Sequence, residues 1–157
     1  MAIYALYGVA VLLALAPIAV VLAASPRASN VIYGACLVVT LVLCVVGVIS
    51  LLGRTSSSVT LPLGLPWLGA HFRIDALAAF FMIVVNLGGA AASLFAIGYG
   101  QHEQAPERVL PFYPAYLAGM NLVVLSDDAF SFLVSWEFMS LSSWALVIAH
   151  HWERENL

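Results

Sequence analysis

The sequence predicts an all-α membrane protein of about five transmembrane helices. Of its 157 residues, 64% are hydrophobic and only 8% are charged, and the mean hydropathy is +1.05. A soluble domain carries about 25% charged residues, so lipid must surround most of this chain. Apolar runs long enough to cross the hydrocarbon core recur along the sequence. The net charge of −3 without a basic patch gives no sign of nucleic-acid binding.

Breakers and polar clusters divide the chain into five apolar runs within a single membrane domain, residues 1–157. The first run ends before Ser25-Pro26. Its length and its lack of a positively charged start favour a retained helix over a cleaved signal peptide. Asp75 is the expected N-cap of the third run, and Asp127-Asp128 form a tight acidic turn before the fifth. We expect helices over about residues 2–24, 31–53, 75–97, 109–125 and 129–149.

One substantial loop, residues 54–73, separates the second and third runs. Its turn-forming residues predict a short hairpin at the membrane interface, with β-like pieces around Pro62–Pro66 and Trp67 as an anchor. With the N-terminus outside, three arginines lie on the inner side and two on the outer. The positive-inside rule therefore favours this orientation.

Glu137 is the ionisable side chain that lies well inside one of these runs. It follows Asp128 by nine residues, which places it about 13 Å below the surface. A charged group at the centre of a bilayer costs about 3 kcal/mol on insertion scales, and acidic residues at that depth often mark ion pathways. The structural alternative is a protonated carboxyl that is hydrogen-bonded to a neighbouring helix. We therefore take Glu137 as the candidate proton-translocation residue.

A proton-exchanging carboxyl at this depth needs a basic partner. Desolvation raises the pKa of a carboxyl, and an approaching cation lowers it. This chain has no lysine, and its five arginines all lie near the predicted helix ends. The partner of Glu137 must therefore come from elsewhere.

Three further residues are candidates for supporting the site. Ser140 and Trp144 follow Glu137 by about one and two helical turns. Asn121 is a polar group at depth in the fourth run. Close packing is the alternative role for Ser140, and interhelical hydrogen bonding is the alternative for Asn121. The sequence has no metal-ligand spacing, phosphate loop or nucleophile turn, so we expect neither a metal nor a cofactor.

The string from Trp136 to Ala149, with Glu137 followed by Phe-Met-Ser-Leu-Ser-Ser-Trp, resembles the fifth helix of the antiporter-like subunits of respiratory complex I and its relatives. It is most similar to the branch of hydrogenase-4 component B and the formate hydrogenlyase membrane subunit. The resemblance extends upstream through Asp127–Phe130, Asn121 and Phe72–Leu77, and covers about residues 72–151. It implies that the loop 54–73 corresponds to a hairpin on the outer face of the membrane.

The same resemblance implies a function. Members of this family have about fourteen or more helices, and their fifth-helix glutamate pairs with a lysine on the seventh helix. Glu137 matches that glutamate, and a seventh-helix lysine would lie beyond residue 157. We therefore expect the chain to be the N-terminal part of a larger transporter-like subunit.

The leading hypothesis is a multi-pass protein of the cell inner membrane, in a proton-translocating subunit of a hydrogenase-4 or NADH dehydrogenase-like complex. Its partners would be the lipid bilayer and other membrane subunits, and any redox site would lie outside this chain. The alternatives are a subunit of a multi-subunit sodium/proton antiporter and a non-translocating membrane assembly module. An intramembrane hydrolase is disfavoured, because no serine lies in a nucleophile turn.

Overall fold

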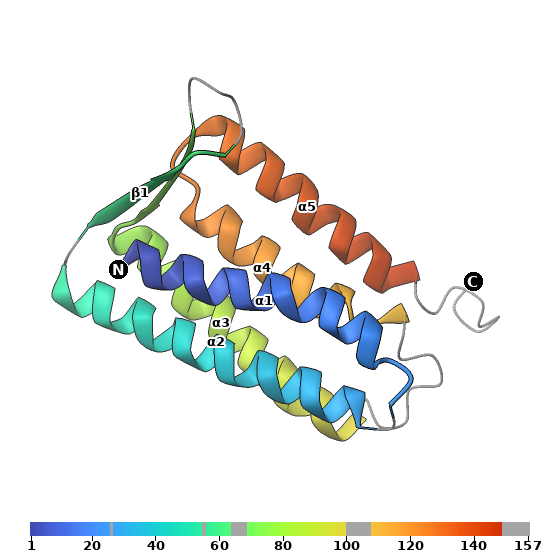
Figure 1. The fold of residues 1–157 in the computed structure, drawn as a ribbon. Helices are drawn as coiled ribbons and strands as arrows, with labels where there is room; N and C mark the ends of the chain where they lie inside the picture. The colour runs from blue at the N-terminus through green and yellow to red at the C-terminus, as the bar shows by residue number, and fades with distance from the viewer. Residues whose placement is uncertain (26, 55, 64–68, 100–107, 149–157) are drawn as a thin grey trace.

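A computed structural model shows a bundle of five helices with a two-stranded hairpin across one end (Figure 1). The structure describes residues 1–25, 27–54, 56–63, 69–99 and 108–148. The elements within these ranges are α1 (Ala2–Leu22), α2 (Ala28–Gly53), β1 (Ser57–Leu61), β2 (Ala70–Ile74), α3 (Ala76–Tyr99), α4 (Phe112–Leu125) and α5 (Ala129–Ile148).

Four of these helices, α1, α2, α3 and α5, are long and apolar enough to cross a membrane. The predicted class, an all-α membrane protein, is confirmed. The exception is α4, which has 14 residues and is about 21 Å long, compared with about 30 Å for the hydrocarbon core. It begins at Phe112 and not at Val109, because Pro111 disfavours a helical conformation for the residue before it and acts as the N-cap.

The other helix ends differ from the expected ones by a few residues. Helix α2 begins at Ala28, ahead of the expected Val31, because its first turn contains the polar pair Ser29-Asn30, which a search for apolar runs excludes. Helix α1 ends at Leu22, and α3 continues to Tyr99. The expected end of the fifth helix at Ala149 lies outside the described residues.

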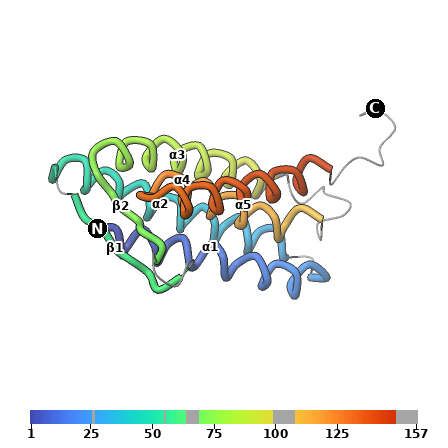
Figure 2. The backbone as a smooth tube through the Cα atoms, turned by 90° about the horizontal axis from the view of Figure 1, so that it is seen from above, coloured from blue at the N-terminus to red at the C-terminus, as the bar shows by residue number. Residues whose placement is uncertain are grey.

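The shortest helix, α4, is the central one. It contacts α1, α3 and α5, while α2 packs along α3. Figures 1 and 2 place it between α5 and the α2–α3 pair, with α1 alongside. Half of its residues are buried, and several of these are small, including Ala115, Ala118 and Gly119. Small residues allow helix backbones to approach closely in a membrane, so α4 can touch three neighbours at once.

The hairpin lies across one end of the bundle (Figure 1). Its strands are antiparallel, with Ser57 opposite Ile74 and Leu61 opposite Ala70. Alternate residues of β2 are buried and contact helices of the bundle. The expected hairpin is present, and β1 ends before Pro62, since proline cannot donate a ladder hydrogen bond. Residues 64–66 of the expected β-like pieces lie outside the described residues. Trp67, the expected anchor, lies outside the described residues.

Helices α4 and α5 approach most tightly at Gly119. A Cβ atom added there would lie 2.9 Å from Cα of Met139 and 3.2 Å from its backbone nitrogen. The backbone of α5 cannot move aside as the end of a flexible side chain can. The absence of a side chain at Gly119 therefore sets the distance between these two helices.

We predict that Gly119→Ala lowers the free energy of unfolding by about 1–3 kcal/mol, the usual cost of overpacking a filled interior. Gly88→Ala is the matched control, because a Cβ there meets no atom within 4 Å and alanine is the better helix former. Thermal unfolding of the purified chain in detergent compares the two variants. Equal midpoints would contradict the tight contact.

Candidate functional site

Glu137 lies near the middle of α5, on a face that points away from the bundle. Leu133, Leu141 and Trp144 share this face by helical spacing, and their exposed fractions are 62%, 62% and 61%. Sequence reasoning expected a buried carboxyl; within this chain the carboxyl is exposed, amid an apolar band. Helices in lipid carry apolar residues on their outer as well as their inner faces, so hydropathy does not show which face meets a neighbour.

The carboxylate of Glu137 makes no hydrogen bond or ion pair with any residue that the structure describes. The described arginines all lie at the ends of elements or in the hairpin. Arg27 and Arg54 flank α2, Arg73 is in β2, and Arg108 precedes α4. None of them lies at the depth of Glu137 along the bundle.

The three candidate supporting residues are separated by the fold. Trp144 lies on the same outward face of α5 as Glu137, and Ser140 is half-buried one turn away. Asn121 is completely buried and bonds to α3 and to its own helix, not to Glu137. The structure thus places Trp144 on the same helix face as the carboxyl, two turns away, and gives Asn121 the interhelical hydrogen bond that was its alternative role.

Asn121 forms a closed amide pair with Asn86 of α3. Nδ2 of Asn86 donates to Oδ1 of Asn121 at 2.7 Å and to the carbonyl of Met82 at 2.8 Å. In return, Nδ2 of Asn121 donates to Oδ1 of Asn86 at 3.3 Å and to the carbonyl of Leu117 at 2.9 Å. Each amide nitrogen has two N–H groups, so all four have acceptors. The pair has no N–H left to offer a carboxylate.

Asp127 and Asp128 connect the end of α4 to the start of α5. Oδ1 of Asp128 accepts the backbone N–H of Ser131 at 2.8 Å, and Oδ2 accepts the Ser131 hydroxyl at 2.6 Å and the backbone N–H of His71 at 2.9 Å. The hydroxyl and the backbone N–H of Ser131, followed by the bond from His71, lower the pKa of Asp128 to about 2. Asp128 therefore caps α5 and ties its first turn to β2.

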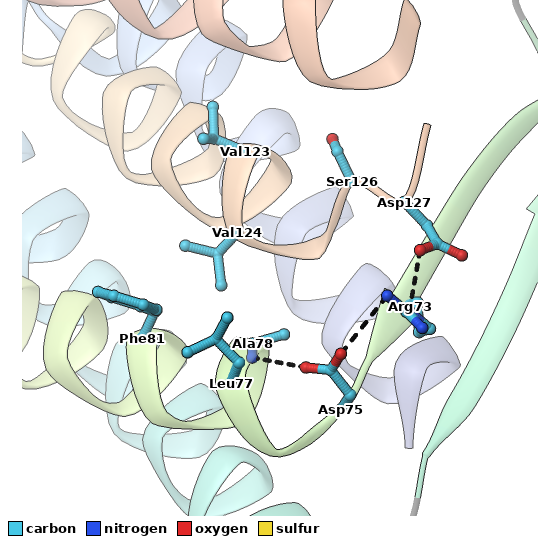
Figure 3. Close-up of a pocket in the computed structure, with 9 residues that line it drawn as sticks. All are labelled: Arg73, Asp75, Leu77, Ala78, Phe81, Val123, Val124, Ser126 and Asp127. Atoms are coloured by element: carbon cyan, nitrogen blue, oxygen red, sulfur yellow. Dashed lines mark hydrogen bonds and ion pairs between the residues drawn. The ribbon is translucent and has the colours of Figure 1, made fainter. Parts of the chain in front are cut away.

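Arg73 of β2 links two helix starts (Figure 3). Its Nε lies 2.9 Å from Oδ1 of Asp127, and one terminal guanidinium nitrogen lies 3.5 Å from Oδ2 of Asp75. The other oxygen of Asp75 accepts the backbone N–H of Ala78 at 2.9 Å, which is the expected cap of α3. These charges are largely solvated, so the pairs stabilise the fold by little. Their effect is to orient the hairpin.

Arg73 and His71 lie in the loop that the sequence predicts between the second and third runs, and no motif there singles them out. The signal that could have found their roles is charge complementarity, since an Arg-x-Asp segment and an Asp-Asp turn both lie at the same predicted end of the helices. The pairing depends on the register of β2 against the α4–α5 turn. Phe72 bridges to Ser126, and the N–H of Asp127 donates to the carbonyl of His71 at 2.9 Å.

Comparison with known proteins gives matches over about half of this chain. It is 32% identical over 87 residues to an uncharacterised protein of Mycobacterium tuberculosis. The matched segment covers 55% of this chain and 14% of that protein. It is 38% identical over 79 residues to hydrogenase-4 component B of Escherichia coli, 49% of the chain and 12% of that protein. No family model matches the chain.

A third relative, from Staphylococcus saprophyticus, is named as an antiporter subunit and is 29% identical over 91 residues, 54% of the chain and 11% of that protein. Matches of 27–28% identity reach subunit L of NADH-quinone oxidoreductases. The chain thus spans only a small part of the length of the curated relatives it matches.

Fold and relatives together define a multi-pass membrane protein of the kind found as subunits of larger membrane complexes. More particularly, over about half of its length the chain is similar to antiporter-like subunits of complex I-like enzymes, membrane hydrogenases and multi-subunit antiporters. The resemblance drawn from the fifth helix is confirmed.

The lowered pKa of Asp128 predicts an acid-dependent stability. A carboxylate with a depressed pKa stabilises the folded state above the ordinary aspartate value of about 4, and this contribution is lost as the pH falls toward about 2. Asp128→Asn keeps a capping side chain but removes the charge. We expect it to be less stable at neutral pH and to lose less stability on acidification.

Thermal unfolding in detergent between neutral pH and about pH 2 measures this difference. Ser131→Ala is the matched variant, because it leaves the carboxylate in place and removes the hydroxyl that bonds to it. Its acid dependence should lie between those of the wild type and Asp128→Asn. Identical profiles for all three proteins would rule out this role of Asp128.

Proposed function

We propose that this chain provides the N-terminal helices of a proton-translocating membrane subunit in which Glu137 acts on a basic group brought by another membrane segment. The observation that carries the proposal is the position of this carboxyl. It lies mid-helix on an exposed apolar face, and no described residue pairs with it. A charge in hydrocarbon costs about 3 kcal/mol or more, so a second segment that covers this face and neutralises the charge is favoured.

The chemistry of such a pair follows from electrostatics. A carboxylate and a cation 4 Å apart attract by about 4 kcal/mol at an effective dielectric constant of about 20. That energy corresponds to about three pKa units on the basic group. When the two groups separate, the basic group loses this support and can release its proton. Doubling the distance between Glu137 and its partner halves this attraction and lowers the pKa of the basic group by about 1.5 units.

The proposed setting is a redox-driven complex in the cell inner membrane. Two kinds of relatives, a hydrogenase component and subunits of NADH-quinone oxidoreductases, support it. In this setting other subunits transfer the electrons, and this chain takes part in ion translocation. The Glu-x-Met-Ser-Leu-Ser-Ser-Trp string in α5 supports the hydrogenase-4 branch.

We predict that Glu137→Gln in the complete complex reduces proton translocation by about tenfold or more, because the uncharged amide no longer raises the pKa of the basic partner. Proton uptake by inverted membrane vesicles, driven by the electron donor of the complex, measures the effect. Normal uptake by this variant would refute the proposal.

Two variants control for damage to the helix. Leu141→Gln places the same side chain on the same face, one turn away, where the residue is also exposed; it should retain translocation. Glu137→Asp keeps the charge on a shorter side chain and should retain more activity than Glu137→Gln. If Leu141→Gln were as defective as Glu137→Gln, the loss would reflect a disturbed face and not a lost carboxylate.

A sodium/proton antiporter subunit is the alternative that the staphylococcal relative supports. For the redox-driven complex we expect proton uptake to require the electron donor, and a sodium gradient alone to move no protons. An antiporter shows the reverse dependence. Imposing a sodium pulse on vesicles without the electron donor distinguishes the two.

If both tests are negative while the complex fails to assemble without this chain, an assembly module is the remaining function.

A further inference from the structure

We infer that Asn86 and Asn121 are positioning residues that hold α4 in one register on α3, and thereby set where α5 presents Glu137. The inference rests on the proposed function of Glu137. It concerns residues that do not contact the carboxyl, since both amides are completely buried between α3 and α4.

The first step is that the amide pair is specific for one register. Each asparagine donates to its partner and to a carbonyl one turn earlier in its own helix, Met82 or Leu117. Sliding α4 by one turn, about 5.4 Å, would break both interhelical bonds and leave one N–H and the carbonyl oxygen of each buried amide unsatisfied. Unsatisfied buried polar groups are costly, so the other registers are disfavoured.

The second step is that the amide pair adds directional contacts to the apolar packing at this place. Leu117 of α4 packs against Gly89 of α3, where an added Cβ would lie 2.9 Å from its Cδ2 atom. This apolar contact has no directional requirement, whereas the amide pair requires both hydrogen bonds to be aligned. Within the described part of the two helices, the hydroxyl of Tyr113 also bonds to α3, with Ser93 and with the carbonyl of Gly89. A single buried polar residue is known to specify register in helical assemblies.

The third step is that the position of α4 determines the position of α5. Gly119 precedes Asn121 by two residues, so the two lie on nearly opposite sides of α4. Asn121 faces α3, and Gly119 faces the backbone of Met139. Met139 in turn follows Glu137 by two residues. If α4 slid or rotated, a residue with a side chain would replace Gly119 at this contact, and α5 would have to move.

The test separates register from stability. We compare Asn86→Leu and Asn121→Leu with the double variant in the complete complex. Each single variant leaves one buried amide unsatisfied and should unfold at a lower temperature. The double variant removes both amides and keeps the same branched arrangement of four side-chain heavy atoms, so its stability should return toward that of the wild type. Proton translocation should nevertheless stay reduced by about tenfold in the double variant.

A purely structural role predicts that translocation returns together with stability. A double variant with wild-type translocation would therefore overturn the inference. So would a double variant that does not fold, since the pair would then be needed for stability itself. Tyr113→Phe is the matched control. It removes the hydrogen bonds of the tyrosine hydroxyl and leaves the amide pair intact, so it should retain translocation.

A distance measurement makes the test independent of Glu137. Spin labels at Leu87 of α3 and Leu141 of α5, both exposed, report the position of α5 relative to α3 once Cys36 and Cys44 are replaced by serine. We expect the double variant to broaden the distance distribution or shift it by up to about 5 Å, the rise of one helical turn. An unchanged distribution would contradict the inference. Normal translocation by Glu137→Gln would instead contradict the proposed function alone.

Discussion

The cost of holding a charge in hydrocarbon is the constraint on which the rest of this structure depends. Glu137 occupies the middle of α5, on a face that is otherwise apolar and exposed. Lipid satisfies the leucines and tryptophan of this face but not a carboxylate. Among the described residues, Glu137 is therefore a carboxyl on an apolar outer face without a partner, and the segment that we propose to cover this face carries positive charge at the same depth. The matches to subunits of larger membrane assemblies agree with that interpretation.

The remaining interactions determine where the carboxyl stands. At the hairpin end, Asp128 ties the first turn of α5 to β2, while Arg73 joins the α4–α5 turn to the start of α3. Nearer the centre, the amide pair joins α4 to α3, and the bare backbone of Gly119 lets α5 lie against α4. Helix α5 is thus held at its end and at its middle by polar or steric contacts that each allow one arrangement. Apolar packing between the helices stabilises the bundle further but does not by itself determine the position of α5.

Much of this fold follows from the sequence, and the exceptions have physical reasons. Runs of apolar residues predict the helices well, because the length of a span is set by the bilayer. The start of α4 was misplaced because Pro111 is compatible with an apolar run but not with a helix that continues through it. The outward direction of Glu137 could not be predicted, since both faces of α5 are apolar. The mutual hydrogen bonds of Asn86 and Asn121 could not be predicted either. They depend on how α3 packs against α4, and the two residues are 35 positions apart in the sequence.

The shortness of α4 has an electrical consequence. The helix dipole places partial charges of about half a unit at the two ends of a helix, and a helix of about 21 Å is shorter than a hydrocarbon core of about 30 Å. Leu110 and Pro111, which precede α4, are buried, so its first turn lies inside the bundle. In such low-dielectric surroundings the partial charges act on neighbouring groups more strongly than they would in water.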